Sequence, residues 1–236
     1  MLKNAPHLPE IPRRNDITTQ EYIYQRLRRA IMLGLIAPGN PITIRGLAEL
    51  LDTSPTPVRE ALRRLSSEHA LKMLPNRRII VPQMTPDRFK ELIMLRITLE
   101  EHAAHAALPF ISNRLVDHLT TLDDQIDQAV IDGDRDQLIS INQEFHKLIY
   151  TANPEQVVMP MIESVWLQLG PFTRIAARNV KELYVVDHHK EILTALRERH
   201  EAKLITAICA DIQGGVGHLH ADALKRILGT PETTGK

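Results

Sequence analysis

Apolar residues recur every three or four positions through the first third of the chain, and this spacing predicts three short amphipathic helices. The first lies around residues 22–31 and ends before Gly34 and the Pro38-Gly39 pair. The segment 42–65, ITIRGLAELLDTSPTPVREALRRL, predicts two further helices joined by a tight turn. The inward positions of the last helix are Val58, Ala61, Leu62 and Leu65.

Two short apolar runs follow these helices, at residues 70–74 and 79–81. Between them lies a turn-forming segment that ends in two cations, Pro75-Asn76-Arg77-Arg78. This pattern predicts a β-hairpin wing whose arginines are available to phosphates or to a minor groove. Together the elements predict a winged helix-turn-helix over residues 16–84, preceded by a poorly ordered arm at 1–15.

The pattern changes near residues 82–86, and from residue 85 onward it predicts long amphipathic helices. They are expected near 86–108, 112–132, 134–152, 155–177, 180–199 and 201–228. Because aromatic residues make up only 4% of the chain, this core must consist of Leu, Ile, Ala and Val, as in a helical bundle. The predicted fold class is therefore mainly α, with an all-α domain at 85–229 and a flexible tail at 230–236.

The last helix of the 42–65 segment carries Arg59 and Arg63 four positions apart, on one face. In a helix-turn-helix this helix enters the DNA major groove, where arginine can fork onto guanine O6 and N7. Ser54 is a good N-cap for it, and a proline is tolerated at the helix start because that N–H has no intrahelical partner. The alternative is a solvated basic helix in an ordinary helical domain.

The formal net charge of the chain is zero, which by itself argues against nucleic-acid binding. The charge is unevenly divided, however: residues 1–84 hold 13 Lys+Arg and 7 Asp+Glu, and the remainder holds 16 and 22. A basic module on an acidic body is typical of a DNA-reading domain joined to another domain. The single cysteine, Cys209, suits a reducing cytosol. Without a long apolar run or a signal peptide, we expect a cytoplasmic protein with no membrane association.

The segment 45–65, with its Leu-Ala-Glu and Pro-Val-Arg-Glu-Ala-Leu-Arg-Arg-Leu pieces, resembles the GntR family of bacterial transcription regulators. The C-terminal half resembles the FCD effector-binding domain of the FadR subfamily, through the segments 96–100, 142–146 and 189–193. The resemblance implies a homodimer that binds a palindromic double-stranded DNA operator. It also implies that a small organic acid, on entering the helical domain, releases the DNA.

The resemblance places DNA contacts at Arg45, Thr56 and Arg59. With the helix head and the wing included, the expected DNA-binding residues are Arg45, Ser54, Thr56, Pro57, Arg59, Arg63, Arg77 and Arg78. The chain departs from the family at Pro55, where an arginine is usual. A bidentate base contact contributes about 1–3 kcal/mol of discrimination, so the operator sequence is expected to differ from the common family site.

Asn142 and His146 lie four positions apart and so project from one helix face, a spacing suited to two ligands of one ion. Family members that bind a divalent metal use an aspartate and three histidines. In this chain Asn142 stands for the aspartate, His146 and His189 match two histidines, and Asp211 stands for the third. The set can hold Zn²⁺, Ni²⁺, Mn²⁺ or Fe²⁺, or it can line a metal-free polar pocket. Both alternatives stay open.

Arg96 is the natural partner of an anionic effector, because a guanidinium binds a carboxylate bidentately. Its alternative role is an ion pair with Glu100, one turn along the same helix. The expected effector-binding residues are Arg96, Asn142, His146, His189 and Asp211.

The favoured function is a ligand-responsive transcription regulator, expected to be a repressor and not an enzyme. One rival is a metal-dependent enzyme that uses His146, His189 and Asp211. The chain contains no HExxH motif, no nucleophile–base pairing and no phosphate loop, which argues against that rival. A second rival is a dimerisation scaffold that binds no small molecule.

Overall fold

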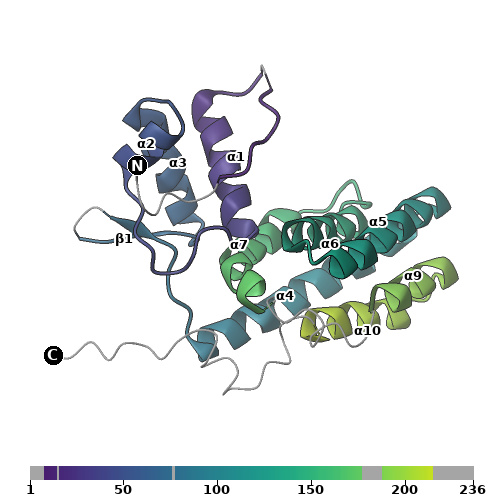
Figure 1. Cartoon of the computed structure of the whole chain (residues 1–236). Helices are drawn as coiled ribbons and strands as arrows, with labels where there is room; N and C mark the ends of the chain where they lie inside the picture. The colour runs from purple at the N-terminus through teal and green to yellow at the C-terminus, as the bar shows by residue number, and fades with distance from the viewer. Residues whose placement is uncertain (1–7, 15, 76–77, 177–187, 215–236) are drawn as a thin grey trace. The chain divides into compact units, whose positions relative to one another are not determined.

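The computed structural model describes residues 8–14, 16–75, 78–176 and 188–214, and the chain divides into two compact units (Figure 1). The first unit is Met1–Met84 together with Trp166–Phe172. The second unit is Thr85–Val165 and Thr173–Lys236.

The described residues of the first unit form a winged helix-turn-helix, the fold that the periodicity predicts. The helices are α1 (Thr19–Met32), α2 (Ile44–Leu50) and α3 (Pro55–Ser67), and the strands are β1 (Lys72–Met73) and β2 (Ile79–Ile80). The α3 helix packs on both α1 and α2. The two strands pair antiparallel, with Lys72 opposite Ile80 and Met73 opposite Ile79. All four predicted inward positions of α3 are buried.

The expectation of a poorly ordered arm at residues 1–15 needs correction for the part that the structure describes. Leu8 is buried, and the Arg26 guanidinium donates hydrogen bonds to the backbone oxygens of Leu8 and Pro9, at 3.0 and 3.2 Å. Prolines exclude a helix here, but they do not prevent an extended segment from packing on α1. Residues 1–7 and the expected flexible tail at 230–236 lie outside the described residues.

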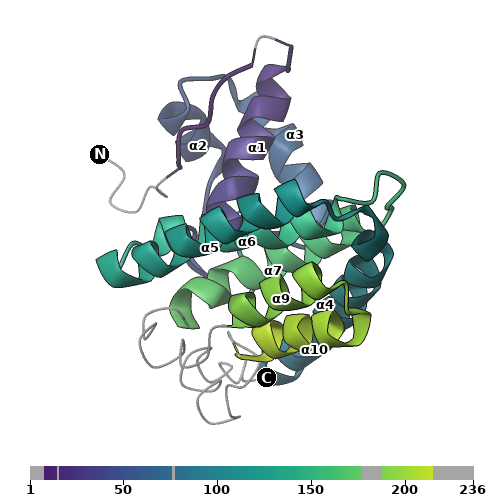
Figure 2. The same cartoon turned by 90° about the vertical axis from the view of Figure 1, so that its right-hand side faces the viewer.

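The second unit is all helical in its described residues (Figure 2). Its helices are α4 (Pro86–Ala107), α5 (Asn113–Asp132), α6 (Arg135–Tyr150), α9 (His188–Glu198) and α10 (Glu201–Ile212), with a short 3-10 turn at Leu108–Phe110. The two ends of α7 (Met159–Ala176) also belong to it, whereas Trp166–Phe172 of that helix belong to the first unit. The α6 and α10 helices both pack on α4, while α5 packs on α6 and α9. The α9 and α10 helices pack on each other. This arrangement brings one face of each of α6, α9 and α10 into the same core.

Helix boundaries in this unit follow local hydrogen-bonding chemistry. The α5 helix ends at Gly133, whose φ of 71° is the left-handed conformation that glycine adopts without strain. The predicted helix 155–177 begins later, at Met159, because Asn153 and Gln156 side chains accept hydrogen bonds from the backbone N–H groups of Glu155 and Met159. The start of the predicted helix 180–199 and the end of 201–228 lie outside the described residues. Within the described part of the chain, a helix of membrane-spanning length and hydropathy is absent.

Candidate functional sites

The α3 helix presents its polar face to solvent and its apolar face to the core. Thr56, Arg59 and Arg63 are exposed, whereas Val58 and Ala61 are buried. The Arg63 side chain is 67% exposed, and its ion pair with Glu60, at 3.4 Å, lies within the helix. The exposed face of α3 therefore carries the cations and the hydroxyl that the sequence predicts for DNA binding.

Arg64, the next residue, has a different role. Its Nη1 lies 2.8 Å from Glu21 of α1, and its guanidinium stacks 3.6 Å from the ring centroid of Tyr24, also in α1. A second carboxylate, Glu68, lies 3.4 Å from its Nε. Burial and the hydrogen bond to Glu68 raise the pKa of Tyr24 to about 12. Arg64 therefore joins α3 to α1 and does not belong to the exposed basic face.

The head of α3 corrects the expectation that Ser54 caps this helix. Ser54 occupies the N-cap position, but its side chain makes no capping hydrogen bond within the described structure. A capping serine accepts a bond from the second or third helical N–H, and the third residue, Pro57, has none. Pro55 at the first position also lacks an N–H, so Thr56 offers the one backbone donor among these three residues. Anion binding at this end of α3 must therefore come mainly from side chains.

The remaining predicted DNA contacts lie on α2 and on the wing. Arg45 and Arg78 are exposed, and Arg77 lies outside the described residues. The wing also exposes Lys72 and Met73, which the sequence analysis did not select. In the sequence both residues lie in the short run 70–74, where the outward positions are hard to tell from the inward ones.

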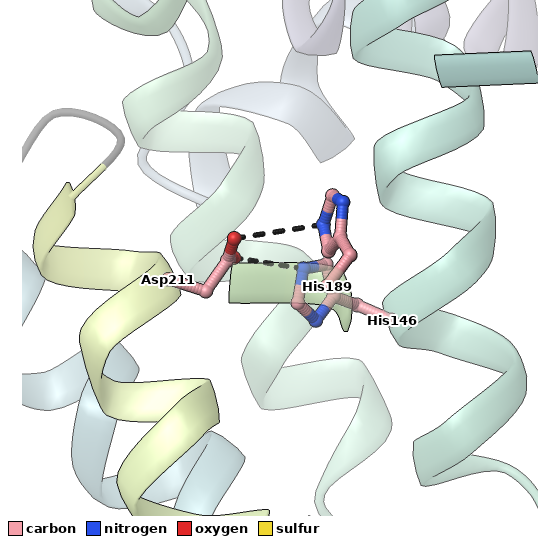
Figure 3. A group of neighbouring side chains, drawn as sticks. All are labelled: His146, His189 and Asp211. Atoms are coloured by element: carbon pink, nitrogen blue, oxygen red, sulfur yellow. Dashed lines mark ion pairs between the residues drawn. The ribbon is translucent and has the colours of Figure 1, made fainter. Parts of the chain in front are cut away.

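In the second unit, His146 of α6, His189 of α9 and Asp211 of α10 converge on one point (Figure 3). The Nε2 atoms of His146 and His189 lie 3.0 and 3.5 Å from the two carboxylate oxygens of Asp211. Both imidazoles are fully buried, and the Asp211 side chain is 15% exposed. One potential ligand atom from each residue lies within 4.8 Å of the other two. The structure thus brings together three of the four residues that the sequence proposes as metal ligands.

The surroundings of Asp211 favour its ionised form. Burial alone would raise the pKa of Asp211, but His189, His146 and Arg96 outweigh the burial and hold this pKa well below its usual range. A buried carboxylate that faces two imidazole nitrogens needs a hydrogen-bond donor or a cation between the groups. The partner is either an N–H group of a ring or a metal ion.

Asn142, the fourth proposed ligand, has its amide nitrogen 3.1 Å from Nε2 of His189. In this arrangement the amide nitrogen, which is not a metal ligand, faces the ring. Its role as a metal ligand stays a prediction.

The ion pair that the sequence analysis left as an alternative for Arg96 is present. Arg96 Nε lies 2.6 Å from Oε1 of Glu100, whose side chain is fully buried. Burial would lower the pKa of Arg96, but the attraction of Glu100 outweighs it and raises this pKa above its usual value. The other Glu100 oxygen accepts a 2.6 Å hydrogen bond from the Tyr150 hydroxyl. The effector-binding role of Arg96 stays a prediction.

Two charged residues near the site were missed by the sequence analysis. Asp123 of α5 is 1% exposed, and its Oδ1 lies 3.3 Å from Nδ1 of His189. Lys190 pairs with Asp123 and also with Asp127, at 2.9 Å from the latter. In the sequence, Asp123 is one of several acidic residues on an amphipathic helix, and this pattern is usually a solvated face. Only the packing of α5 on α9 shows that Asp123, unlike a solvated aspartate of the same helix, faces a buried histidine.

Comparisons with known proteins match both units. Residues 19–81 match the bacterial regulatory proteins of the gntR family, and residues 91–214 match the FCD domain. The chain is 29% identical over 200 residues to the HTH-type transcriptional regulator McbR of Escherichia coli, covering 85% of this chain and 86% of McbR. It is 25% identical over 192 residues to the gluconate operon transcriptional repressor of Bacillus subtilis, covering 77% of each. The solved structure of E. coli McbR/YncC superposes with a TM-score of 0.79 at 26% identity, covering 86% of this chain and 97% of that one.

Proposed function

The chain belongs to the gntR family of bacterial regulatory proteins and carries an FCD domain, and from this we propose that it is a repressor. Its relatives are DNA-binding transcription regulators and not enzymes, and one of them is described as a repressor. In the proposal, the protein acts in the cytoplasm as a homodimer on a palindromic operator. A small carboxylate metabolite releases it by favouring one arrangement of the two DNA-binding domains over the other.

The effector part of the proposal depends mainly on one observation, the convergence of His146, His189 and Asp211. We propose that these residues hold one divalent cation. The Nε2 atom of His146 is buried and makes no hydrogen bond of standard geometry among the described residues, although Oδ2 of Asp211 lies 3.0 Å away, and a cation bound by both atoms would satisfy them. Two imidazole nitrogens and a carboxylate oxygen suit Zn²⁺, Ni²⁺, Mn²⁺ or Fe²⁺. Such an ion, when bound, supplies positive charge and open coordination positions to an anionic ligand.

The charges of the surrounding residues support a link between cation and effector. Arg96 and Lys190 are the cations around the site, and Glu100, Asp123, Asp211 and the second partner of Lys190, Asp127, are the anions. With neutral imidazoles, these residues therefore have a net charge of −2. A second carboxylate would be repelled by this charge, so an anionic effector should bind far better when a divalent cation is present.

Calorimetric titration of the metal-free full chain with Zn²⁺, Ni²⁺ and Mn²⁺ tests the cation. We expect one ion per chain, with affinity at least about tenfold lower in His146→Ala, which removes a ligand. His105→Ala is the matched control, because His105 is exposed and pairs with Glu201 on the surface. Wild-type protein that binds none of these ions would refute the metal centre and favour a metal-free polar pocket.

Footprinting on DNA upstream of the protein's own gene tests the repressor. We expect a protected site with two-fold symmetry, and an affinity loss of about 1–3 kcal/mol in Arg59→Ala. A panel of small carboxylates, added with and without the metal, should contain at least one that releases the DNA. If no member of the panel releases the DNA or raises the melting temperature of the protein, the effector proposal is refuted and the dimerisation scaffold is favoured.

A further inference from the structure

The α7 helix contributes to both units of the chain. Its segment Trp166–Phe172 belongs to the first unit, while residues 159–165 and 173–176 belong to the second. We propose that α7 transmits changes in the second unit to α3, through the contact of Gly170 with the last turn of α1. The inference rests on the proposed function, in which an effector bound in the second unit alters DNA binding, and it names the physical route of that response.

The segment of α7 that belongs to the first unit is buried around its whole circumference. Seven of the eight residues from 165 to 172 are buried, and Gln168 is half-buried. A surface helix buries only one stripe, whereas a helix that is apolar all round is enclosed by other parts of the chain. The segment includes Trp166, the single tryptophan of the chain, which is 5% exposed. A shift of this segment must therefore displace neighbouring side chains.

At Gly170, the backbone of α7 meets the backbone of α1 with no side chain between them. A Cβ atom placed on Gly170 would lie 2.5 Å from the backbone oxygen of Met32 and 2.8 Å from that of Ile31. Only glycine permits so close an approach. Because no side chain can change its rotamer here to absorb a shift, a movement of α7 acts directly on the last turn of α1.

The same place is a weak point of α7 as a helix. Pro171 lies inside the helix and has no N–H group, so the intrahelical bond to the carbonyl of Leu167 cannot form, and the helix can bend there. Glycine and proline have the lowest helix propensities, yet they stand side by side within this helix of 18 residues. Such breaks of a local rule are expected at functional positions. A bend at Gly170 would convert a tilt of either end of α7 into movement of α1.

In the second unit, both ends of α7 are joined to α6, the helix that carries His146. Glu163 pairs with Lys147 at 2.7 Å, and Arg174, further along α7, pairs with Asp136. The two ion pairs lie on either side of the segment that belongs to the first unit. Because Lys147 directly follows His146, a rearrangement of α6 around the proposed cation site would move the ends of α7.

The last step leads from α1 to α3. These two helices pack on each other, and Arg64 of α3 contacts Glu21 and Tyr24 of α1. Since α3 exposes Arg59 and Arg63, a shift of α1 would change the position of the side chains that we expect to contact DNA. An effector then alters DNA binding only as far as it favours one position of these helices over another.

Hydrogen exchange of the metal-free full chain tests this route without any ligand. The variant Glu163→Gln/Arg174→Gln removes both ion pairs between α6 and α7. We expect the amides in the last turn of α1 to exchange roughly two- to thirtyfold faster, the usual range for changes along a coupled network, although neither residue lies in the first unit. Glu198→Gln/Lys203→Gln is the matched control: it removes a 2.6 Å ion pair of the second unit that does not involve α7, and α1 should exchange as in wild type.

Gly170→Ala interrupts the route at its narrowest point. The new Cβ forces α7 and α1 apart, and the fluorescence of Trp166 should report this displacement. In the Gly170→Ala background, removal of the two ion pairs should no longer change the exchange of α1, so the two changes are not additive. Circular dichroism establishes that each variant is folded. If Gly170→Ala does not fold, the comparison of the two ion-pair variants still decides the inference.

A titration with Zn²⁺ connects the route to the proposed site. Zn²⁺ should change the exchange of the last turn of α1 in wild type but not in Gly170→Ala, although both proteins should bind the ion equally well. A wild-type protein that binds no Zn²⁺ refutes the zinc site, and the metal-free comparison then tests α7 by itself. The inference is overturned if the Glu163→Gln/Arg174→Gln variant leaves α1 unchanged, or if its effect is the same with and without Gly170→Ala.

Discussion

Substitution of two adjacent arginines of α3 should affect two different properties, operator affinity in one case and stability of the fold in the other. Arg63 is 67% exposed, and its ion pair stays within its own helix. Arg64 is 49% exposed and contacts α1 through Glu21 and Tyr24. We therefore expect Arg63→Ala to weaken operator binding without destabilising the fold. Arg64→Ala should do the reverse.

The magnitudes follow from the contacts. A half-exposed cation–π pair contributes about 0.5–1 kcal/mol, and a salt bridge at this exposure contributes about 0.2–1 kcal/mol. The Arg64 contacts therefore account for about 1–2 kcal/mol of the free energy of unfolding. Loss of an arginine contact to a base edge costs about 1–3 kcal/mol of binding, which is the expected effect of Arg63→Ala.

Urea unfolding and a gel shift on the footprinted site, both with the full chain, measure the two effects. Operator affinity is compared at a temperature where every variant is fully folded. If Arg64→Ala weakens DNA binding as much as Arg63→Ala while the fold stays stable, the division of α3 into a packed face and a reading face is wrong.

Three further changes test the second unit. Asn142→Asp introduces the carboxylate that the family resemblance implies at this position, and we expect calorimetry to show at least about tenfold tighter Zn²⁺ binding; equal affinity would mean that this position supplies no ligand. Lys190→Met leaves the buried Asp123 without its lysine, and urea unfolding should show a loss of about 2 kcal/mol. Burial and the hydrogen bond to Glu101 raise the pKa of Cys209 to about 12, so its alkylation at mildly alkaline pH should be at least about tenfold slower than in the unfolded chain. Because the folded pKa is the higher one, the Cys209 contribution to stability is complete below the unfolded thiol pKa and is lost as the pH rises toward 12.

The winged helix-turn-helix could be predicted because its determinants are local. Helical spacing at Val58, Ala61 and Leu62 and the turn chemistry before residue 78 depend on neighbours within a few positions. Ser54 occupies the N-cap position of α3 without making the expected capping hydrogen bond, and the reason is equally local, because Pro57 at the third helical position has no N–H to donate. Considering the two positions together would have shown the conflict.

In the buried site, some of the residues could be predicted from the sequence and others could not. His146, His189 and Asp211 could be proposed from spacing and family resemblance, and the structure brings them together. Asp123 could not, because it reaches His189 only through the packing of α5 on α9. Tyr150 lies one turn after His146 on the same helix, so helical spacing alone indicates that contact. An aspartate on an amphipathic helix has the same local sequence signal whether it faces solvent or a ring nitrogen.

Stability does not explain why such groups lie in this core. Glu100, Asp123 and both histidines are buried among Leu, Ile and Ala side chains, and an apolar core of the same shape is often as stable or more stable. Each buried carboxylate is paired with a cation, Asp123 with Lys190 and Glu100 with Arg96. Asp123 also contacts His189 directly, and Glu100 is linked to His146 through the Tyr150 hydroxyl. Arg96 and Lys190 offset the cost of burying these carboxylates, and the contacts with the histidines join both ion pairs to the His146–His189–Asp211 cluster.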